Sequence, residues 1–307
     1  MNVSFPENTS FEPKVYTVTV TGHGVAPQTV TITQAAAEKT DLADGVGGWL
    51  ESPALTGNED FVGTLYAGSK RNYSYSYDYT RYTQMWAAYP LYADAMGSLS
   101  RDNVWSYNPQ ISVAGDGQVN ITGSTSYGVS YGSGTNYYAR GHMVPNASRN
   151  GDKTMQDQTF YVTNSVPQVQ NHFNSGMWSS LESAMQTIAK QTDTLYLVTG
   201  VAFRKQGGSE EIKYITPQAD PDKQVPVPNY FYKVALKVKR EGGKVTSASS
   251  VGVWLENKEY DESNYRDYTV SVDQIERWTG MNFFVNLPDT LESLAETNSD
   301  WTVFTDF

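Results

Sequence analysis

Residues 160–182 read FYVTNSVPQVQNHFNSGMWSSLE, a stretch that passes from a strand-like run into a helix. We predict a strand over residues 159–163 that ends near Asn164, after which Pro167 breaks the chain. An amphipathic helix is predicted over residues 177–190, because its apolar residues recur with the period of a helix. These apolar residues are Met177, Leu181, Met185 and Ile188.

Two polar side chains of this helix could carry chemistry. Asn174 lies at its head, where an asparagine is most often a cap but can also offer Mg²⁺ a neutral carbonyl oxygen. Glu182 lies roughly 12 Å further along a helical axis. It is too distant to share an ion with Asn174, so we predict that it holds metal-bound water or a nearby arginine. Trp178, between them, is predicted to be a packing anchor.

The second informative stretch is YYARGHMVPNASR, residues 137–149. The chain has only three histidines, and His142 directly follows Arg140 and Gly141. A phosphodiester hydrolase must deprotonate water and neutralise charge on its transition state. Histidine suits the first task because its pKa lies near neutrality, and the planar guanidinium of arginine matches phosphate oxygens. Taken alone, Arg-Gly-His is more often an ordinary loop than a catalytic site.

The remaining pattern is typical of an α+β protein with a mixed or antiparallel sheet core. Alternating apolar and polar residues predict a hairpin over residues 15–34 and a strand pair over residues 71–92. The tyrosines of the second pair are predicted to line a half-buried sheet face rather than a base-stacking surface. Residues 268–280 are predicted to form a strand and a short helix that ends at Gly280. Further strands are predicted at 194–200, 230–238 and 250–255.

The pattern of the sequence changes near residue 42, and we place a domain boundary there. We predict an N-terminal β extension, or the remnant of a β-domain, over residues 1–42 and one domain over residues 43–307. The N-terminal part is too short for an independent hydrophobic core. His23 lies in the loop of the predicted hairpin and is expected to be a turn residue rather than a ligand.

The composition limits the classes of function. Cysteine is absent, which excludes disulfides, thiolate metal sites and cysteine nucleophiles. The net charge of −11 argues against a protein that coats nucleic acid, but it allows a local cationic cleft. We expect no membrane span and find no signal segment at the N-terminus. The composition, rich in Tyr, Gly and Ser, leads us to expect a bacterial protein that is exported to the periplasm, cell surface or medium.

Taken together, the two stretches resemble the DNA/RNA non-specific endonucleases, the ββα-metal family of endonuclease G-like enzymes. The resemblance covers residues 48–290 and implies an α+β fold that contains a ββα-metal finger motif. It rests on the order and spacing of Arg140-Gly141-His142, Thr163-Asn164, Pro167-Gln168, and Asn174-x-Gly176-x-Trp178-x-x-Leu181-Glu182.

The resemblance implies an endonuclease that depends on Mg²⁺, or alternatively on Mn²⁺, and hydrolyses both DNA and RNA to give 5′-phosphate ends. His142 would be the general base, and Asn174 would be the one direct protein ligand of the ion. Arg140 and Glu182 would orient the phosphate and the water shell of the metal. DNA and RNA are the expected partners, as substrates, and no other partner is predicted.

Three positions depart from the pattern of the family. Acidic residues are expected where this chain has Ala139 and Ser148, and an arginine that contacts phosphate is expected where it has Gln186. Another arginine would have to replace that contact. We predict that Arg149 binds substrate together with Arg140; Arg204 is the other candidate.

Two alternatives remain open at this stage. His172 precedes Asn174 closely and could be a second metal ligand, although such a histidine is more often exposed to solvent or part of a cap. The whole protein could also be a catalytically weak relative that serves as a binding module at a surface. The intact residues His142, Arg140, Asn174 and Glu182 favour the enzyme.

Overall fold

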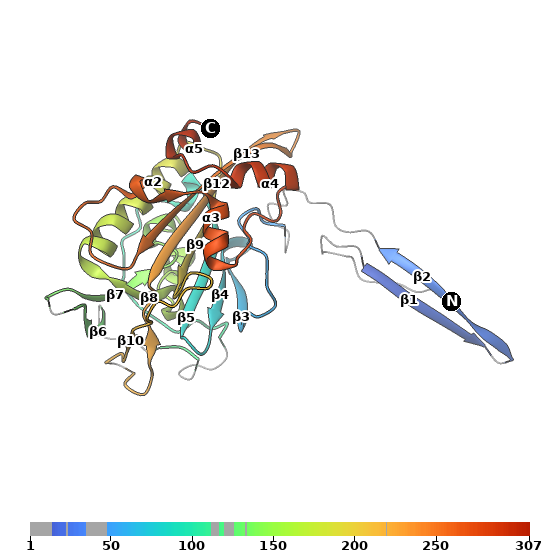
Figure 1. Cartoon of the computed structure of the whole chain (residues 1–307), viewed down its shortest axis with the longest axis horizontal. Coiled ribbons are helices and arrows are strands. Elements are labelled where there is room, and N and C mark those ends of the chain that lie inside the picture. Colours follow the sequence, from blue (N-terminus) through green and yellow to red (C-terminus); the bar gives the residue numbers. More distant parts are fainter. Residues whose placement is uncertain are drawn as a thin grey trace.

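The computed structural model describes residues 14–22, 24–34, 48–111, 117–119, 126–132, 134–218 and 220–307. Its centre is a seven-stranded sheet in which every neighbouring pair is antiparallel (Figure 1). The strands follow the spatial order β14 (Thr269–Val270), β13 (Lys244–Glu256), β12 (Tyr230–Glu241), β9 (Leu195–Ala202), β5 (Thr83–Leu91), β4 (Lys70–Asp78) and β3 (Phe61–Ala67).

A smaller antiparallel sheet joins β6 (Ser126–Ser130), β7 (Tyr137–His142) and β8 (Ser165–Val169). β8 leads directly into a helical segment, η4 (Gln170–Trp178), which continues as α2 (Ser179–Ala189). The pair β7–β8 followed by this helix is the predicted ββα unit. The other helices of at least one turn are α1 (Lys153–Gln158), α3 (Val272–Thr279), α4 (Asp289–Glu296) and α5 (Trp301–Asp306).

Successive side chains of a strand point to opposite faces of the large sheet, and each face carries its own hydrophobic core. One core contains Tyr73, Tyr75 and Tyr77 of β4, all at most 1% exposed, together with Leu181 and Met185 of α2. The other core contains residues of α3 and α4 packed on the opposite face of the same strands. The tyrosines are therefore more deeply buried than a half-buried sheet face requires, and they are core residues rather than a stacking surface. The large sheet thus separates the ββα unit from α3 and α4.

Most predicted elements are confirmed, including the strand pair over 71–92, the later strands and the helix after 177. Gly280 ends α3 in the left-handed conformation, with φ 75°, as its position predicted. The strand predicted over residues 159–163 is wrong. Those residues form a turn and the start of a short 3₁₀ helix (η3, Val162–Asn164), and the strand begins only at Ser165.

The predicted N-terminal hairpin is present as β1 (Lys14–Gly22) paired with β2 (Val25–Gln34). His23 and residues 35–47 lie outside the described residues, so the expected turn role of His23 and the boundary near residue 42 stay predictions. A minor pair, β10 (Tyr214–Ile215) with β11 (Val225–Pro226), completes the strands. Among the described residues, no helix combines the length and the apolar character needed to cross a membrane.

Candidate active site

His142 is the last residue of β7, where it pairs with Ser165 at the start of β8. Gly141 precedes it because a larger residue would collide with the neighbouring strand. A Cβ atom at Gly141 would lie 2.4 Å from Oε1 of Gln168 and 2.6 Å from its Cβ. Glycine is therefore required here for the close approach of the Gln168 side chain.

The imidazole of His142 packs against two aromatic rings, which also contact each other edge to face. Its ring centroid is 4.9 Å from that of Trp105 and 5.4 Å from that of Phe160, which meets it edge to face. The Nε2 atom is buried and has no hydrogen-bond partner in the described part of the chain. Burial, followed by the charges of Arg101 and Arg140, lowers the pKa of His142 to about 3. The imidazole is therefore neutral near pH 7.

Two arginines lie beside these aromatic rings. The guanidinium carbon of Arg140 is 4.5 Å from the centre of the Trp105 ring, and that of Arg101 is 5.4 Å from the centre of the Phe160 ring. Arg140 thus lies close to His142, and the roles predicted for the two residues stay predictions. Arg101 was not predicted, because it belongs to a loop with no motif of its own. The structure thus brings two cations to His142, one from β7 and one from the loop after β5.

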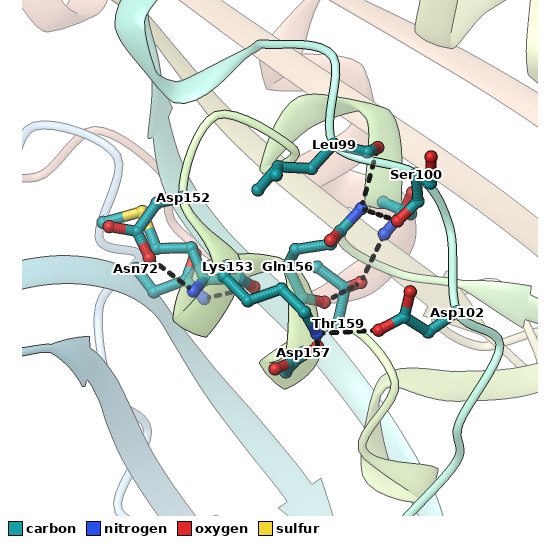
Figure 2. Close-up of polar contacts among 11 residues, drawn as sticks. Asn72, Leu99, Ser100, Asp102, Asp152, Lys153, Gln156, Asp157 and Thr159 are labelled. Atoms are coloured by element: carbon teal, nitrogen blue, oxygen red, sulfur yellow. Dashed lines mark hydrogen bonds and ion pairs between the residues drawn. The ribbon is translucent and has the colours of Figure 1, made fainter.

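The loop that carries Arg101 is tied to α1 on both sides of the arginine, as Figure 2 shows. The amide of Gln156 donates to the carbonyl oxygens of Leu99 and Ser100, each at 3.2 Å. Nζ of Lys153 lies 2.8 Å from a carboxylate oxygen of Asp102. These contacts fix the backbone around Arg101 although the arginine itself is exposed.

Asn174 lies in η4, the segment that joins β8 to α2. The segment is interrupted at its start, because Asn171 is extended and His172 has φ 65°, a left-handed conformation unusual for histidine. Nδ2 of Asn174 donates to Oε1 of Gln170 at 2.8 Å, which fixes the orientation of the amide. Its Oδ1 accepts no hydrogen bond from any described residue and is available to a metal ion. His172 is exposed, as expected for a residue that faces solvent.

Glu182 lies on the first turn of α2, in the same region as Arg101. Burial raises the pKa of Glu182 to about 7, although Lys233 and Arg101 both favour the ionised carboxylate. Lys233, on β12, is fully buried, and its Nζ lies 4.9 Å from the centre of the Trp178 ring. Trp178 is itself only 1% exposed, as expected of a packing anchor. The carboxyl group of Glu182 is therefore poised to change protonation near neutral pH.

Arg149 is placed differently from the prediction. It is only 1% exposed, and its guanidinium donates to backbone carbonyl oxygens of Asn72, Pro90 and Ser148. Its Nε also donates to Oδ1 of Asn72 at 2.6 Å. All three guanidinium nitrogens therefore have protein acceptors. We correct its assignment from substrate binding to a structural role that ties the segment after His142 to β4 and β5.

This structural role predicts a large loss of stability in Arg149→Met. The substitution leaves several buried acceptors unpaired, and we expect the free energy of unfolding to fall by roughly 3 kcal/mol or more. Urea denaturation followed by tryptophan fluorescence measures the change. Arg266→Met, at an exposed arginine, is the control and should alter stability by less than about 0.5 kcal/mol. A variant as stable as wild type that no longer cleaves nucleic acid would return Arg149 to the substrate site.

Two of the positions that depart from the family pattern contact each other. Nε2 of Gln186, on α2, lies 3.4 Å from Oγ of Ser148. A neutral pair therefore stands where an arginine and an acidic residue are expected. Arg204 does not replace the missing cation through any contact at His142; its Nε donates to the carbonyl oxygen of Glu210 at 2.7 Å. Arg101 is an additional cation that the structure places near His142.

Comparisons with known proteins find nucleases that are similar to this chain. The nuclease of Nostoc sp. is 29% identical over 238 residues, which cover 75% of this chain and 77% of that protein. Mitochondrial endonuclease G of Caenorhabditis elegans is 31% identical over 151 residues, 49% of this chain and 48% of that protein. The match to mitochondrial nuclease 1 of Schizosaccharomyces pombe covers 47% of that relative, so the chain spans about half the length of these two proteins.

A crystal structure of EndoG in complex with EndoGI, described as showing the mechanism of EndoG inhibition, shares the fold. The TM-score is 0.61 at 23% sequence identity, and the match covers 79% of this chain and 91% of that one. The profile of the family described as "DNA/RNA non-specific endonuclease" matches residues 56–290. The chain belongs to the DNA/RNA non-specific endonuclease family, whose members are phosphodiester hydrolases.

Proposed function

We propose that this protein is a Mg²⁺-dependent endonuclease that cleaves DNA and RNA, with His142 as general base. The observation that carries the proposal is the buried, unpaired Nε2 of His142, which is neutral, packs against Trp105 and Phe160 and lies beside two arginines. A structural histidine in a protein core is usually hydrogen-bonded. A phosphate bound by the two arginines would offset the charges that lower the pKa of His142, so that the neutral imidazole could take a proton from water.

Two side chains of the ββα unit fit a hydrated magnesium ion. Mg²⁺ keeps several waters and takes few protein ligands, all of them oxygens. Oδ1 of Asn174 is a neutral oxygen on an amide held by its bond to Gln170, and both polar atoms of Gln168 are buried without a partner among the described residues. We assign Asn174 as the direct ligand, and Mn²⁺ is the alternative ion. When bound, the ion would stabilise negative charge on the phosphate and the leaving oxygen.

The other residues would hold the reactants in position. Arg140, over the Trp105 ring, and Arg101, over the Phe160 ring, would bind phosphate oxygens, and the planar guanidinium suits that contact. Glu182, when ionised, would accept hydrogen bonds from water or from Arg101. Because these contacts address phosphate and water rather than base edges, we propose that DNA and RNA are both substrates and that the products carry 5′-phosphate ends. We further propose that the protein acts outside the bacterial cytoplasm.

The proposal is tested by cleavage of supercoiled plasmid and of RNA in Mg²⁺, in Mn²⁺ and in EDTA. We expect cleavage of both substrates with metal and none in EDTA. Asn174→Ala should raise the Mg²⁺ concentration for half-maximal rate by about 10- to 100-fold, the size of effect seen when a metal site loses a supporting group. Wild-type protein that binds plasmid but does not cut it with either ion would support the binding module instead.

The role of Arg101 gives a separate prediction. Arg101→Ala should lower the cleavage rate by about tenfold to a hundredfold, less than a fully buried donor would, because the guanidinium is exposed. Gln156→Ala, which frees the loop without touching the arginine, should cause a smaller loss of the same kind. Initial rates on plasmid measure both. If Arg101→Ala cleaves at the wild-type rate while Arg140→Ala does not, Arg101 does not contribute to phosphate binding.

A further inference from the structure

Three carboxylates meet on the face of the large sheet that lies opposite the ββα unit. Asp273 and Glu276 are one turn apart on α3, and Glu296 is the last residue of α4. One carboxylate oxygen from each residue lies within 4.8 Å of the others. The neighbouring residues Val272, Ile275 and Ala295 belong to the core on this face, whereas α2 packs into the other core. The carboxylate cluster is therefore separate from the region of His142.

Glu296 is the member of this cluster that most needs a partner. Its side chain is only 5% exposed, and Oε1 has no hydrogen-bond partner within the described ranges. Burial and then repulsion by Glu276, Glu292 and Asp273 raise the pKa of Glu296 to about 9. All three charges that raise the pKa of Glu296 are carboxylates. Arg277 favours ionised Glu276, but Arg277 is exposed and its guanidinium donates to Oε1 of Gln274 at 3.1 Å.

The backbone around the cluster is held in place by hydrogen bonds. Oε1 of Glu276 accepts from the backbone amide of Phe283 at 2.7 Å, which fixes this side chain on α3. Oγ of Ser250, on β13, donates to the carbonyl oxygen of Ala295 at 2.8 Å, which anchors the end of α4 beside Glu296. The positions of the three acids are therefore set by two anchored helices. One of the acids, Glu296, is buried.

We propose that Asp273, Glu276 and Glu296 bind a divalent cation, Ca²⁺ in preference to Mg²⁺, that links α3 to α4. The three groups offer only oxygen atoms from carboxylates, which is the donor set that hard cations select. Asp273 and Glu276 are only partly buried, so water can complete the coordination sphere. Ca²⁺ tolerates irregular geometry and six to eight oxygens, whereas Mg²⁺ demands a near-ideal octahedron. The site would act in stability and would be independent of cleavage.

The test uses the full chain carrying Asn174→Ala, so that the ion proposed for the active site does not contribute. Thermal unfolding is followed in EDTA and in millimolar Ca²⁺. If the ion binds only the folded protein, Ca²⁺ should raise Tm by about 3 °C or more at a hundredfold excess over Kd. Adding Glu296→Gln should abolish this rise. Adding Glu292→Gln, which removes a charge from the same helix but no member of the cluster, should leave it nearly intact.

Two outcomes would overturn the proposal. A Ca²⁺ effect that persists in Glu296→Gln would show that the ion binds elsewhere. The absence of any effect of Ca²⁺, Mg²⁺ or Mn²⁺, with Glu296→Gln more stable than its parent in EDTA, would show that the acids share protons rather than a metal. If Glu296→Gln does not fold, Asp273→Asn provides the same comparison at a less buried position.

Discussion

His142→Ala is expected to lower the rate of plasmid cleavage by about 10²–10⁴-fold, the usual contribution of a general base. The substitution removes the unpaired imidazole nitrogen that lies beside Trp105 and Phe160. The rate in saturating Mg²⁺ should remain low, because the loss is of proton transfer and not of metal affinity. His172→Ala is the matched control, since His172 is exposed, and its rate should stay within twofold of wild type, roughly the scatter of a neutral surface change.

Two further measurements separate a catalytic from a structural role for His142. Imidazole added to His142→Ala should restore part of the rate by occupying the space that the side chain leaves beside the two aromatic rings. A variant that is merely misfolded would not respond. If His142→Ala cleaves plasmid at the wild-type rate, the assignment of the base is wrong whatever the family membership.

The pKa of His142 also makes a prediction about stability. The pKa is about 3 in the folded protein and near 6.5 in the unfolded chain, so the unfolded state binds more protons between these values. Stability should therefore fall as the pH decreases below about 6.5, with His142 contributing to the slope. In His142→Ala, measured by urea denaturation in EDTA, that slope should be shallower. An unchanged slope would mean that the imidazole is not held neutral.

The elements of the sheet could be predicted because their sequences alternate and are bounded by turn residues. The stretch TFYVT over 159–163 is rich in aromatic and β-branched residues but is not a strand. Its backbone forms only an isolated bridge, between Tyr161 and Ser106. Nδ2 of Asn164 donates to the carbonyl oxygens of Thr159 and Val144, and its Oδ1 accepts from the backbone amide of Val144 at 3.0 Å. The bonds to Ser106 and Val144 join residues distant in the sequence, and no local pattern reveals them.

The candidate site could be predicted only as far as its motifs are contiguous. His142, Arg140, Asn174 and Glu182 each lie in a recognisable run. Arg149 lies in the same run as His142, yet it is buried, because burial of an arginine depends on the acceptors that β4 and β5 present. Arg101 belongs to no motif, and it reaches His142 only because α1 holds its loop. The tertiary structure, rather than the local sequence, therefore decides which arginines lie near His142.

Glu182→Gln is expected to lower the cleavage rate and raise the stability of the protein at the same time. The neutral amide cannot serve as the anionic acceptor for water or Arg101, and we expect a loss of about 10²-fold in rate. The stability effect follows from the pKa. Burial raises the pKa of Glu182 from 4.5 to about 7, even against the attraction of Lys233 and Arg101, so ionisation disfavours the folded state.

The size of this stability effect depends on pH in a defined way. Below about pH 4.5 the carboxyl is protonated in both states and contributes no difference. As the pH rises from there through 7, the unfolded chain ionises first, so wild type loses stability, on the order of 1–3 kcal/mol in total. Glu182→Gln carries no such penalty. In EDTA it should be more stable than wild type at pH 8 and equally stable near pH 4.5.

Urea denaturation at the two pH values, together with plasmid cleavage at pH 8, measures both effects. Glu262→Gln, at an exposed acid in a surface loop, is the control and should change neither. Glu182→Gln that is less active and also less stable at pH 8 would mean that the carboxylate is a structural partner of buried Lys233. Lower activity with higher stability is expected only if the fold tolerates an unfavourable charge that the reaction requires, as functional sites commonly do.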